Sequence, residues 1–224
     1  MCHASWRGLA LGDVSMNEFW GNVSWRVSDF FLPETKRISL WSLVGRGILL
    51  GVVTAYGWQY HRMSMMQLSD DMSSSPLHLV HLVFHEAGHV LFSWFGEFMH
   101  VLGGSLFQVL VPFIWFVAAR FWGNDAFAGA LCLWLTGHSL VDVAPYINDA
   151  RSLQLMLLGG GTGREVEGHD WEYLLTALNL LHKDVYISRA VLSAGRWVMA
   201  FSLLWAAVVL AVQYREQRGA DDRP

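Results

Sequence analysis

Apolar residues gather in five runs, each close to the length of about 20 residues that an α-helix needs to cross a bilayer. The runs cover residues 38–60, 77–95, 98–122, 126–147 and 190–212. Trp41 and Trp58 stand near opposite ends of the first run, where interfacial tryptophans are typical. We therefore expect an all-α polytopic membrane protein with about five transmembrane helices.

The polar segments between these runs predict the organisation of the chain. In order, we expect an N-terminal interfacial or soluble segment, four transmembrane helices, an inner loop with an amphipathic helix at 171–183, a fifth transmembrane helix and a polar tail. These parts cover residues 1–37, 38–147, 148–189, 190–212 and 213–224, with a chemical core at 77–151.

The distribution of basic residues predicts the orientation. With the N-terminus inside, 10 of the 15 Lys and Arg residues fall on the inner side, which the positive-inside rule favours. We expect an integral, multi-pass protein of a bacterial inner membrane with a cytoplasmic N-terminus.

Composition excludes several classes of protein. Only 15% of the residues are charged, against roughly 25% in an ordinary soluble domain, and the net charge of -4 comes with no basic patch. Nucleic-acid binding is therefore not expected. The 2 cysteines are too few for a disulfide framework or a four-thiolate zinc site.

The second apolar run contains the pentapeptide His85-Glu86-Ala87-Gly88-His89, an H-E-x-x-H sequence. On a helix, positions i and i+4 differ by about 40° around the axis and 6 Å along it. Both imidazoles can therefore reach one cation, with Glu86 beside them as a general base. His78 and His81 continue the same helical face, where they either join the site or line a wet cavity.

The membrane environment strengthens the case for a metal. An ionisable side chain at mid-bilayer costs on the order of 2.5–3.5 kcal/mol, and three occur here within one turn. Structural zinc binding contributes on the order of 10–16 kcal/mol in small peptides, whereas a buried hydrogen bond contributes about 1 kcal/mol. We therefore expect a bound Zn²⁺.

A catalytic zinc site with three protein ligands needs one more residue besides His85 and His89. The fourth run offers His138, Asp142 and Asp149, which share one helical face if the helix continues to residue 149. Pro145 would open that helix beside the metal. Depth in the bilayer favours Asp142, and the residue that does not bind would orient a ligand.

Two further pairs of residues are candidates for the site. His169 and Asp170 would reach the metal if the glycine-rich loop before them folds back, although Asp170 is also a plausible helix N-cap. Gly103 and Gly104 would permit close approach of an extended substrate, serve close helix packing or mark a re-entrant segment.

These motifs resemble those of the site-2 protease-like intramembrane metalloproteases, which carry H-E-x-x-H on one core helix and N-x-x-P followed by D-G on another. Here the first motif is His85–His89, Asp142-x-x-Pro145 stands in the position of the second, and Asp149-Ala150 in that of the D-G. The resemblance implies that Asp149 is the third zinc ligand. It also implies that the substrate is a transmembrane segment of another protein.

We therefore predict a zinc-dependent intramembrane protease in which His85, His89 and Asp149 hold Zn²⁺ and Glu86 is the general base. One alternative is a non-catalytic zinc-binding subunit of a larger membrane complex. Another is a b-type haem protein that uses histidines from opposing helices, for example His81 or His85 with His138, an interpretation that gives Glu86 no role.

Overall fold

The structure is a computed structural model that describes residues 30–32, 38–71, 74–158, 160–166 and 168–221. Nearly all of the expected N-terminal segment, residues 1–37, lies outside the described residues. The described helices are α2 (Leu40–Arg62), α3 (Met65–Asp71), α4 (Pro76–Phe92), η1 (Ser93–Phe95), α5 (Glu97–Val117), η2 (Ala118–Trp122), α6 (Ala126–Asn148), α7 (Asp170–Ala177), η3 (Leu181–Lys183) and α8 (Asp184–Asp221). The expected all-α polytopic fold is confirmed.

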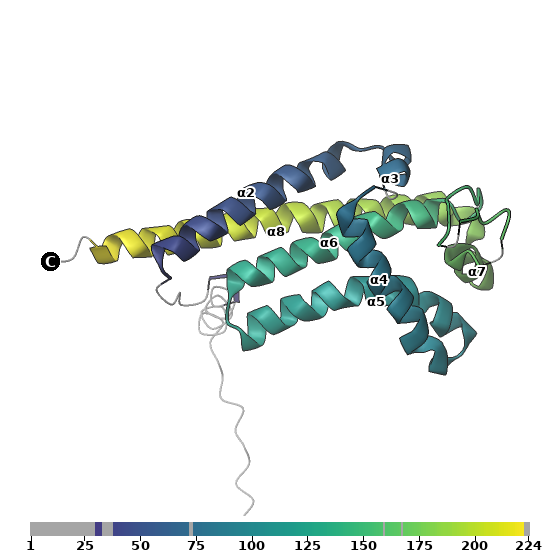
Figure 1. Cartoon of the computed structure of the whole chain (residues 1–224), viewed down its shortest axis with the longest axis horizontal. Coiled ribbons are helices and arrows are strands. Elements are labelled where there is room, and N and C mark those ends of the chain that lie inside the picture. The colour runs from purple at the N-terminus through teal and green to yellow at the C-terminus, as the bar shows by residue number, and fades with distance from the viewer. Residues whose placement is uncertain (1–29, 33–37, 72–73, 159, 167, 222–224) are drawn as a thin grey trace, which may run out of the picture.

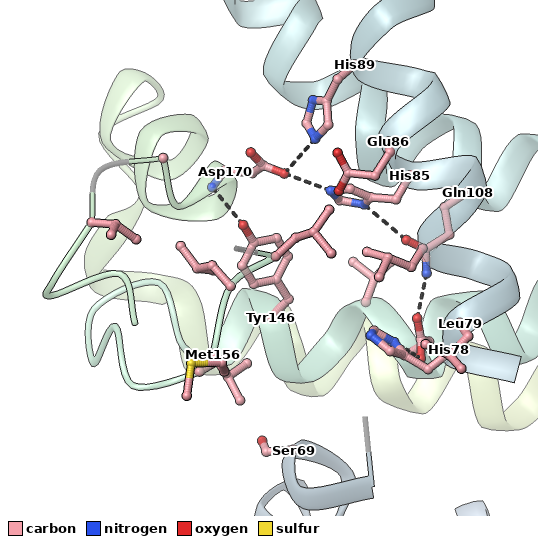
Figure 2. A pocket seen from close by; sticks show the side chains of 18 residues that line it. Ser69, His78, Leu79, His85, Glu86, His89, Gln108, Tyr146, Met156 and Asp170 are labelled. Atoms are coloured by element: carbon pink, nitrogen blue, oxygen red, sulfur yellow. Dashed lines mark hydrogen bonds and ion pairs between the residues drawn. The ribbon is translucent and has the colours of Figure 1, made fainter. Parts of the chain in front are cut away.

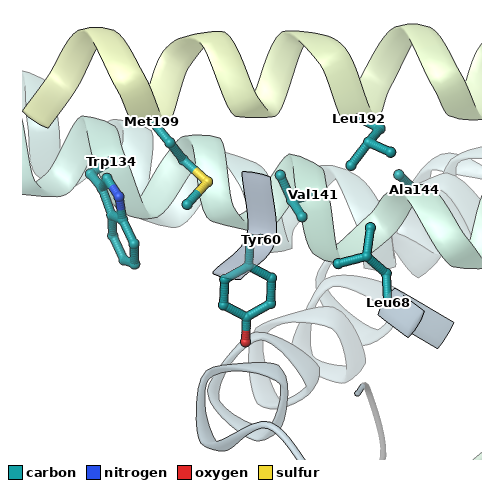
Figure 3. Packing of buried hydrophobic residues seen from close by; sticks show 7 residues of the cluster. All are labelled: Tyr60, Leu68, Trp134, Val141, Ala144, Leu192 and Met199. Atoms are coloured by element: carbon teal, nitrogen blue, oxygen red, sulfur yellow. The ribbon is translucent and has the colours of Figure 1, made fainter. Parts of the chain in front are cut away.

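The long helices are arranged around α6. Helices α2, α6 and α8 lie lengthwise beside one another, α5 lies along α6, and α4 crosses them obliquely (Figure 1). The apolar core between α2, α3, α6 and α8 contains the side chains of Tyr60, Leu68, Trp134, Val141, Ala144, Leu192 and Met199 (Figure 3). Away from this core, α2 leaves apolar side chains such as Trp41 and Ile48 exposed, as a lipid-facing helix does.

Four helical segments in the described part of the chain are long and apolar enough to span a bilayer. They are Leu40–Arg62, Glu97–Trp122, Ala126–Asn148 and Leu181–Gly219. The protein is thus a multi-pass membrane protein, and its described residues contain four such helices where the apolar runs predict about five. The run at 77–95 instead forms the 17-residue α4 and a short 3₁₀ turn.

Local sequence signals explain the length of α4. Ser75 caps its N-terminus through a hydrogen bond from the His78 N–H, and Pro76 occupies the first turn, where it is favoured. At the other end, Gly96 has φ 91°, a conformation that suits glycine, and it separates α4 from α5. Gly96 therefore forms the short connection between η1 and α5.

Three other expectations about helices are corrected. The stretch 171–183 is not one amphipathic helix, because α7 ends at Ala177 and Asn179 takes a left-handed conformation before η3. The last helix runs through Asp221 and takes in most of the expected polar tail. Gly103 and Gly104 lie inside the continuous α5, so they do not mark a re-entrant segment.

Glycines bring α6 and α8 into close contact. A Cβ on Gly137 would lie 2.8 Å from the Gly195 carbonyl oxygen, and a Cβ on Gly195 would lie 2.7 Å from the Gly137 carbonyl oxygen. Both distances are shorter than any normal packing contact, so even alanine would force the two backbones apart.

We predict that Gly137→Ala destabilises the protein by about 1–3 kcal/mol through this overpacking. Unfolding in a series of denaturing detergent mixtures would measure the loss. Gly51→Ala is the matched control, because Gly51 lies within α2 and a Cβ there meets nothing within 4 Å. An equal loss in both variants would contradict the close packing of α6 and α8.

Candidate metal centre

Helix α4 carries the H-E-x-x-H residues on the side that faces α5 and α7. His85 is buried, His89 is half-buried, and the exposed Glu86 lies beside them, where all three line the same pocket (Figure 2). The helical spacing therefore places the two imidazoles and the carboxylate as the sequence predicts.

Asp170 completes a cluster with the two histidines. Its Oδ2 atom lies 2.9 Å from His85 Nε2 and 3.2 Å from His89 Nε2 (Figure 2). In the described part of the chain, these three residues form the one group whose ligand atoms lie within 4.8 Å of one another. Two residues from one helix and one from a distant segment thus meet at a single point.

The donor set and its geometry fit a zinc ion. Ligand atoms about 2.0–2.2 Å from a tetrahedral zinc lie roughly 3.3–3.6 Å apart. Asp170 Oδ2 is 2.9 and 3.2 Å from the two ring nitrogens, so these atoms would have to separate by only a few tenths of an ångström to hold the ion. Two imidazoles and a carboxylate leave the fourth position open, which is the pattern of catalytic zinc sites.

Gly104 keeps the space beside the two ring nitrogens free. A Cβ on Gly104 would lie 2.6 Å from His89 Nε2 and 2.7 Å from His85 Nε2, so any larger residue would fill that space. Gly103 has a different role, because a Cβ there would lie 2.7 Å from the Gly88 carbonyl oxygen of α4. Gly103 therefore serves helix packing, and Gly104 faces the two clustered histidine rings.

Contacts to α5 and α6 hold the segment that carries Asp170. The backbone N–H of Asp170 donates to the Tyr146 hydroxyl at 3.1 Å, and Trp171 Nε1 donates to Ser105 Oγ at 3.1 Å. Burial disfavours a charged carboxylate, but the hydrogen bonds from His85 and His89 outweigh it and lower the pKa of Asp170. The group is therefore an anion, as a metal ligand must be.

The structure does not bring Asp149, the expected third ligand, to this cluster. Its carboxylate accepts hydrogen bonds from Ser152 Oγ and from the backbone N–H groups of Gln154 and Leu155. His169 Nε2 lies 3.4 Å from Asp149 Oδ2. Burial opposes ionisation, yet these interactions lower the pKa of Asp149 to about 2. Asp149 thus anchors the start of the loop at 150–169 and the residue before Asp170.

Helix α6 also differs from the expectation around Pro145. The helix continues through Pro145 to Asn148 and is not opened beside the cluster. Asp149 therefore follows the helix as its C-cap and turns into the loop, instead of sharing a helical face with Asp142.

The other candidate residues form polar contacts outside the cluster. Asp142 accepts a hydrogen bond from Gln108 Nε2 at 2.7 Å and lies 2.9 Å from His78 Nδ1. His81 Nε2 lies 3.0 Å from His138 Nδ1, and both rings are buried. Because these two nitrogens form a direct hydrogen bond, a haem plane does not fit between them.

A pocket of about 510 Å³ extends from the cluster of His85, His89 and Asp170 to the contact between His78 and Asp142. The polar side chains of His78, His85, Glu86, His89, Gln108, Asp142 and Asp170 line it together with apolar residues of α4 and α6. Residues 155–158 of the loop cover one side (Figure 2), and Met156 and Leu158 there are largely exposed. The pocket therefore joins a charged cluster to apolar walls, as substrate sites often do.

Sequence reasoning missed Gln108, although it left a signal. Gln108 is an amide within a strongly apolar helix, and a polar side chain in such a place marks a functional or interhelical contact.

Comparisons with known proteins do not identify a family for this chain. No family model matches it, and neither a curated protein nor a solved structure matches it.

Separate removal of the two aspartates tests which one is the ligand. We predict that Asp170→Ala lowers zinc affinity by more than about 100-fold, whereas Asp149→Ala lowers it less because all three ligand side chains remain. Competition with a chromogenic chelator would measure both affinities.

A second measurement tests the anchoring role of Asp149. Asp149→Ala should speed tryptic cleavage after Arg164, because the loop loses the carboxylate that binds its backbone. Loss of zinc in Asp149→Ala, with full zinc binding in Asp170→Ala, would contradict the observed arrangement.

Proposed function

We propose that this chain is a zinc-dependent intramembrane protease that hydrolyses a peptide bond in a membrane segment of another protein. The observation that carries the proposal is the convergence of His85, His89 and Asp170 beside Glu86 in a pocket of a multi-pass membrane protein. The resemblance of the H-E-x-x-H motif to the site-2 protease-like family supports it.

The three clustered side chains would hold the ion through His85 Nε2, His89 Nε2 and a carboxylate oxygen of Asp170. A zinc ion held there supplies Lewis-acid activation of water and of a peptide carbonyl. His89 Nδ1 is bonded to the His100 carbonyl oxygen at 2.9 Å, which directs its other ring nitrogen toward Asp170.

Glu86 is placed to move protons in this reaction. Its carboxylate is exposed in the pocket and belongs to the same turn as His85 and His89. It would accept a proton from the water that attacks the carbonyl carbon and return that proton to the leaving amine nitrogen. This role explains why a carboxylate stands between two ligands on one helix turn.

The walls of the pocket indicate an apolar substrate. Its lining includes Leu79, Leu82 and Val143 together with the loop residues Leu155 and Leu157. In a transmembrane helix, each peptide carbonyl is already hydrogen-bonded, so the segment must unwind locally before attack. An apolar pocket stabilises the side chains of such an unwound segment.

The basic residues also suggest an orientation in the membrane. Arg7, Arg26, Lys36 and Arg37 before the first spanning helix favour a cytoplasmic N-terminus in a bacterial inner membrane. With four spanning helices, this orientation would place α7 and the loop before it on the opposite, outer side.

Glu86→Gln separates a protease from a non-catalytic zinc subunit. We predict that the variant keeps zinc but loses more than about 100-fold in the cleavage rate, because the amide cannot accept the proton. The assay would follow a panel of single-span reporter proteins in proteoliposomes, with zinc content measured on the same samples.

Glu216→Gln is the matched control, because Glu216 is exposed near the C-terminal end of α8. That end of α8 lies away from α7, which carries Asp170 (Figure 1). Cleavage by the wild type should stop when a chelator removes the metal and return when Zn²⁺ is added. Equal cleavage by the wild type and Glu86→Gln would refute the proposed protease, and zinc binding without any cleavage would favour the subunit.

A further inference from the structure

Gln108 lies between the metal-binding cluster and the Asp142 carboxylate. Its side chain is almost fully buried in α5, with 3% exposure. The Oε1 atom lies 3.2 Å from His85 Nδ1, and Nε2 donates to Asp142 Oδ2 at 2.7 Å (Figure 2). One amide group therefore contacts a metal ligand on one side and a carboxylate on the other.

The Asp142 carboxylate determines which way the Gln108 amide faces. A carboxylate oxygen only accepts hydrogen bonds, so the NH₂ group of Gln108 must point toward Asp142. The carbonyl oxygen of the amide must then point toward His85. The second oxygen of Asp142 lies 2.9 Å from His78 Nδ1, which holds the carboxylate in place.

This orientation of Gln108 has a consequence for the imidazole of His85. Because the amide oxygen only accepts a hydrogen bond, His85 Nδ1 must carry a hydrogen. Nε2, which donates to Asp170 Oδ2 at 2.9 Å beside Gly104, is then the nitrogen that would exchange its hydrogen for a metal ion. His89 has the same arrangement, with the His100 carbonyl oxygen in the place of Gln108.

We propose that Gln108, oriented by Asp142, is a positioning residue that fixes the tautomer of His85 so that Nε2 faces the metal. The proposal rests on the metal site of the proposed function and adds to it the polar group that prepares one of its ligands. Groups that hydrogen-bond to metal-binding histidines typically change metal affinity by 10–100-fold when they are removed.

The direct test removes the acceptor. Gln108→Leu should lower zinc affinity by about 10–100-fold in chelator competition, because the Nδ1–H tautomer of His85 loses its partner. Gln213→Leu is the matched control, since Gln213 is also buried and accepts a hydrogen bond from Arg46 instead. Zinc affinity of Gln108→Leu within about twofold of the wild type would overturn the proposal.

An exchange of the two groups tests the mechanism rather than the mere presence of polar atoms. In the double variant Gln108→Glu/Asp142→Asn, a carboxylate would accept from His85, and the new amide would donate to that carboxylate. The double variant should regain most of the affinity that Gln108→Glu alone loses by facing a second carboxylate. No gain of the double variant over the single one would overturn the proposed orientation.

The tautomer itself is measurable without any metal in Asp170→Ala, in which no carboxylate accepts from His85 Nε2. The ¹⁵N chemical shifts of ring-labelled histidine, assigned to His85 by their loss in His85→Ala, should show hydrogen on Nδ1 in this variant. Adding Gln108→Leu should shift the population toward hydrogen on Nε2. A neutral His85 with hydrogen on Nε2 in Asp170→Ala would overturn the proposal even if the wild type binds zinc. Absence of zinc binding with the expected tautomer would instead count against the proposed function alone.

Discussion

The described structure depends on giving the histidines of one helix polar partners among otherwise apolar helices. Helix α4 carries four histidines along one face, and an unpartnered polar side chain in such surroundings is costly. Every one of the four rings has a polar partner: His78 contacts Asp142, His81 contacts His138, and His85 contacts Gln108 and Asp170. His89 meets the His100 carbonyl oxygen and Asp170. These partners come from α5, α6 and α7, so the polar face of α4 selects how the other helices pack against it.

Close backbone packing makes these contacts possible. A Cβ on Gly88 would lie only 2.1 Å from the Gly103 carbonyl oxygen, so α4 and α5 approach each other more closely than larger side chains would permit. That approach brings Gln108 within hydrogen-bonding distance of His85. It also leaves Gly104 beside the ring nitrogens. Gly103 therefore permits the close packing of α4 and α5, whereas its neighbour Gly104 leaves space beside the clustered histidine rings.

Much of the fold and two of the three residues of the cluster follow from local sequence patterns. Apolar run lengths predict the spanning helices, and helical spacing alone brings His85 and His89 together. The sequence names Asp170 as one of several candidates for the third side chain, but no local pattern selects it. Projecting α6 as a straight helix places Asp149 on a face that it does not occupy, because α6 ends at Asn148. Asp170 reaches the histidines through a loop whose return path depends on tertiary contacts to Tyr146 and Ser105, which have no periodicity in the sequence.

The three clustered groups come from different elements. Binding of a metal ion would therefore depend on how those elements pack against one another. His85 and His89 are fixed by one helix turn, whereas Asp170 is supplied by α7 and the loop that Asp149 anchors. An ion that needs all three groups binds only the state in which α7 is docked against α5 and α6. Such a ligand would stabilise the docked state by its own binding free energy, and docking would in turn raise the affinity of the proposed site. The contacts of Trp171 and Tyr146 would therefore contribute to metal affinity, although neither side chain belongs to the cluster of ligand atoms.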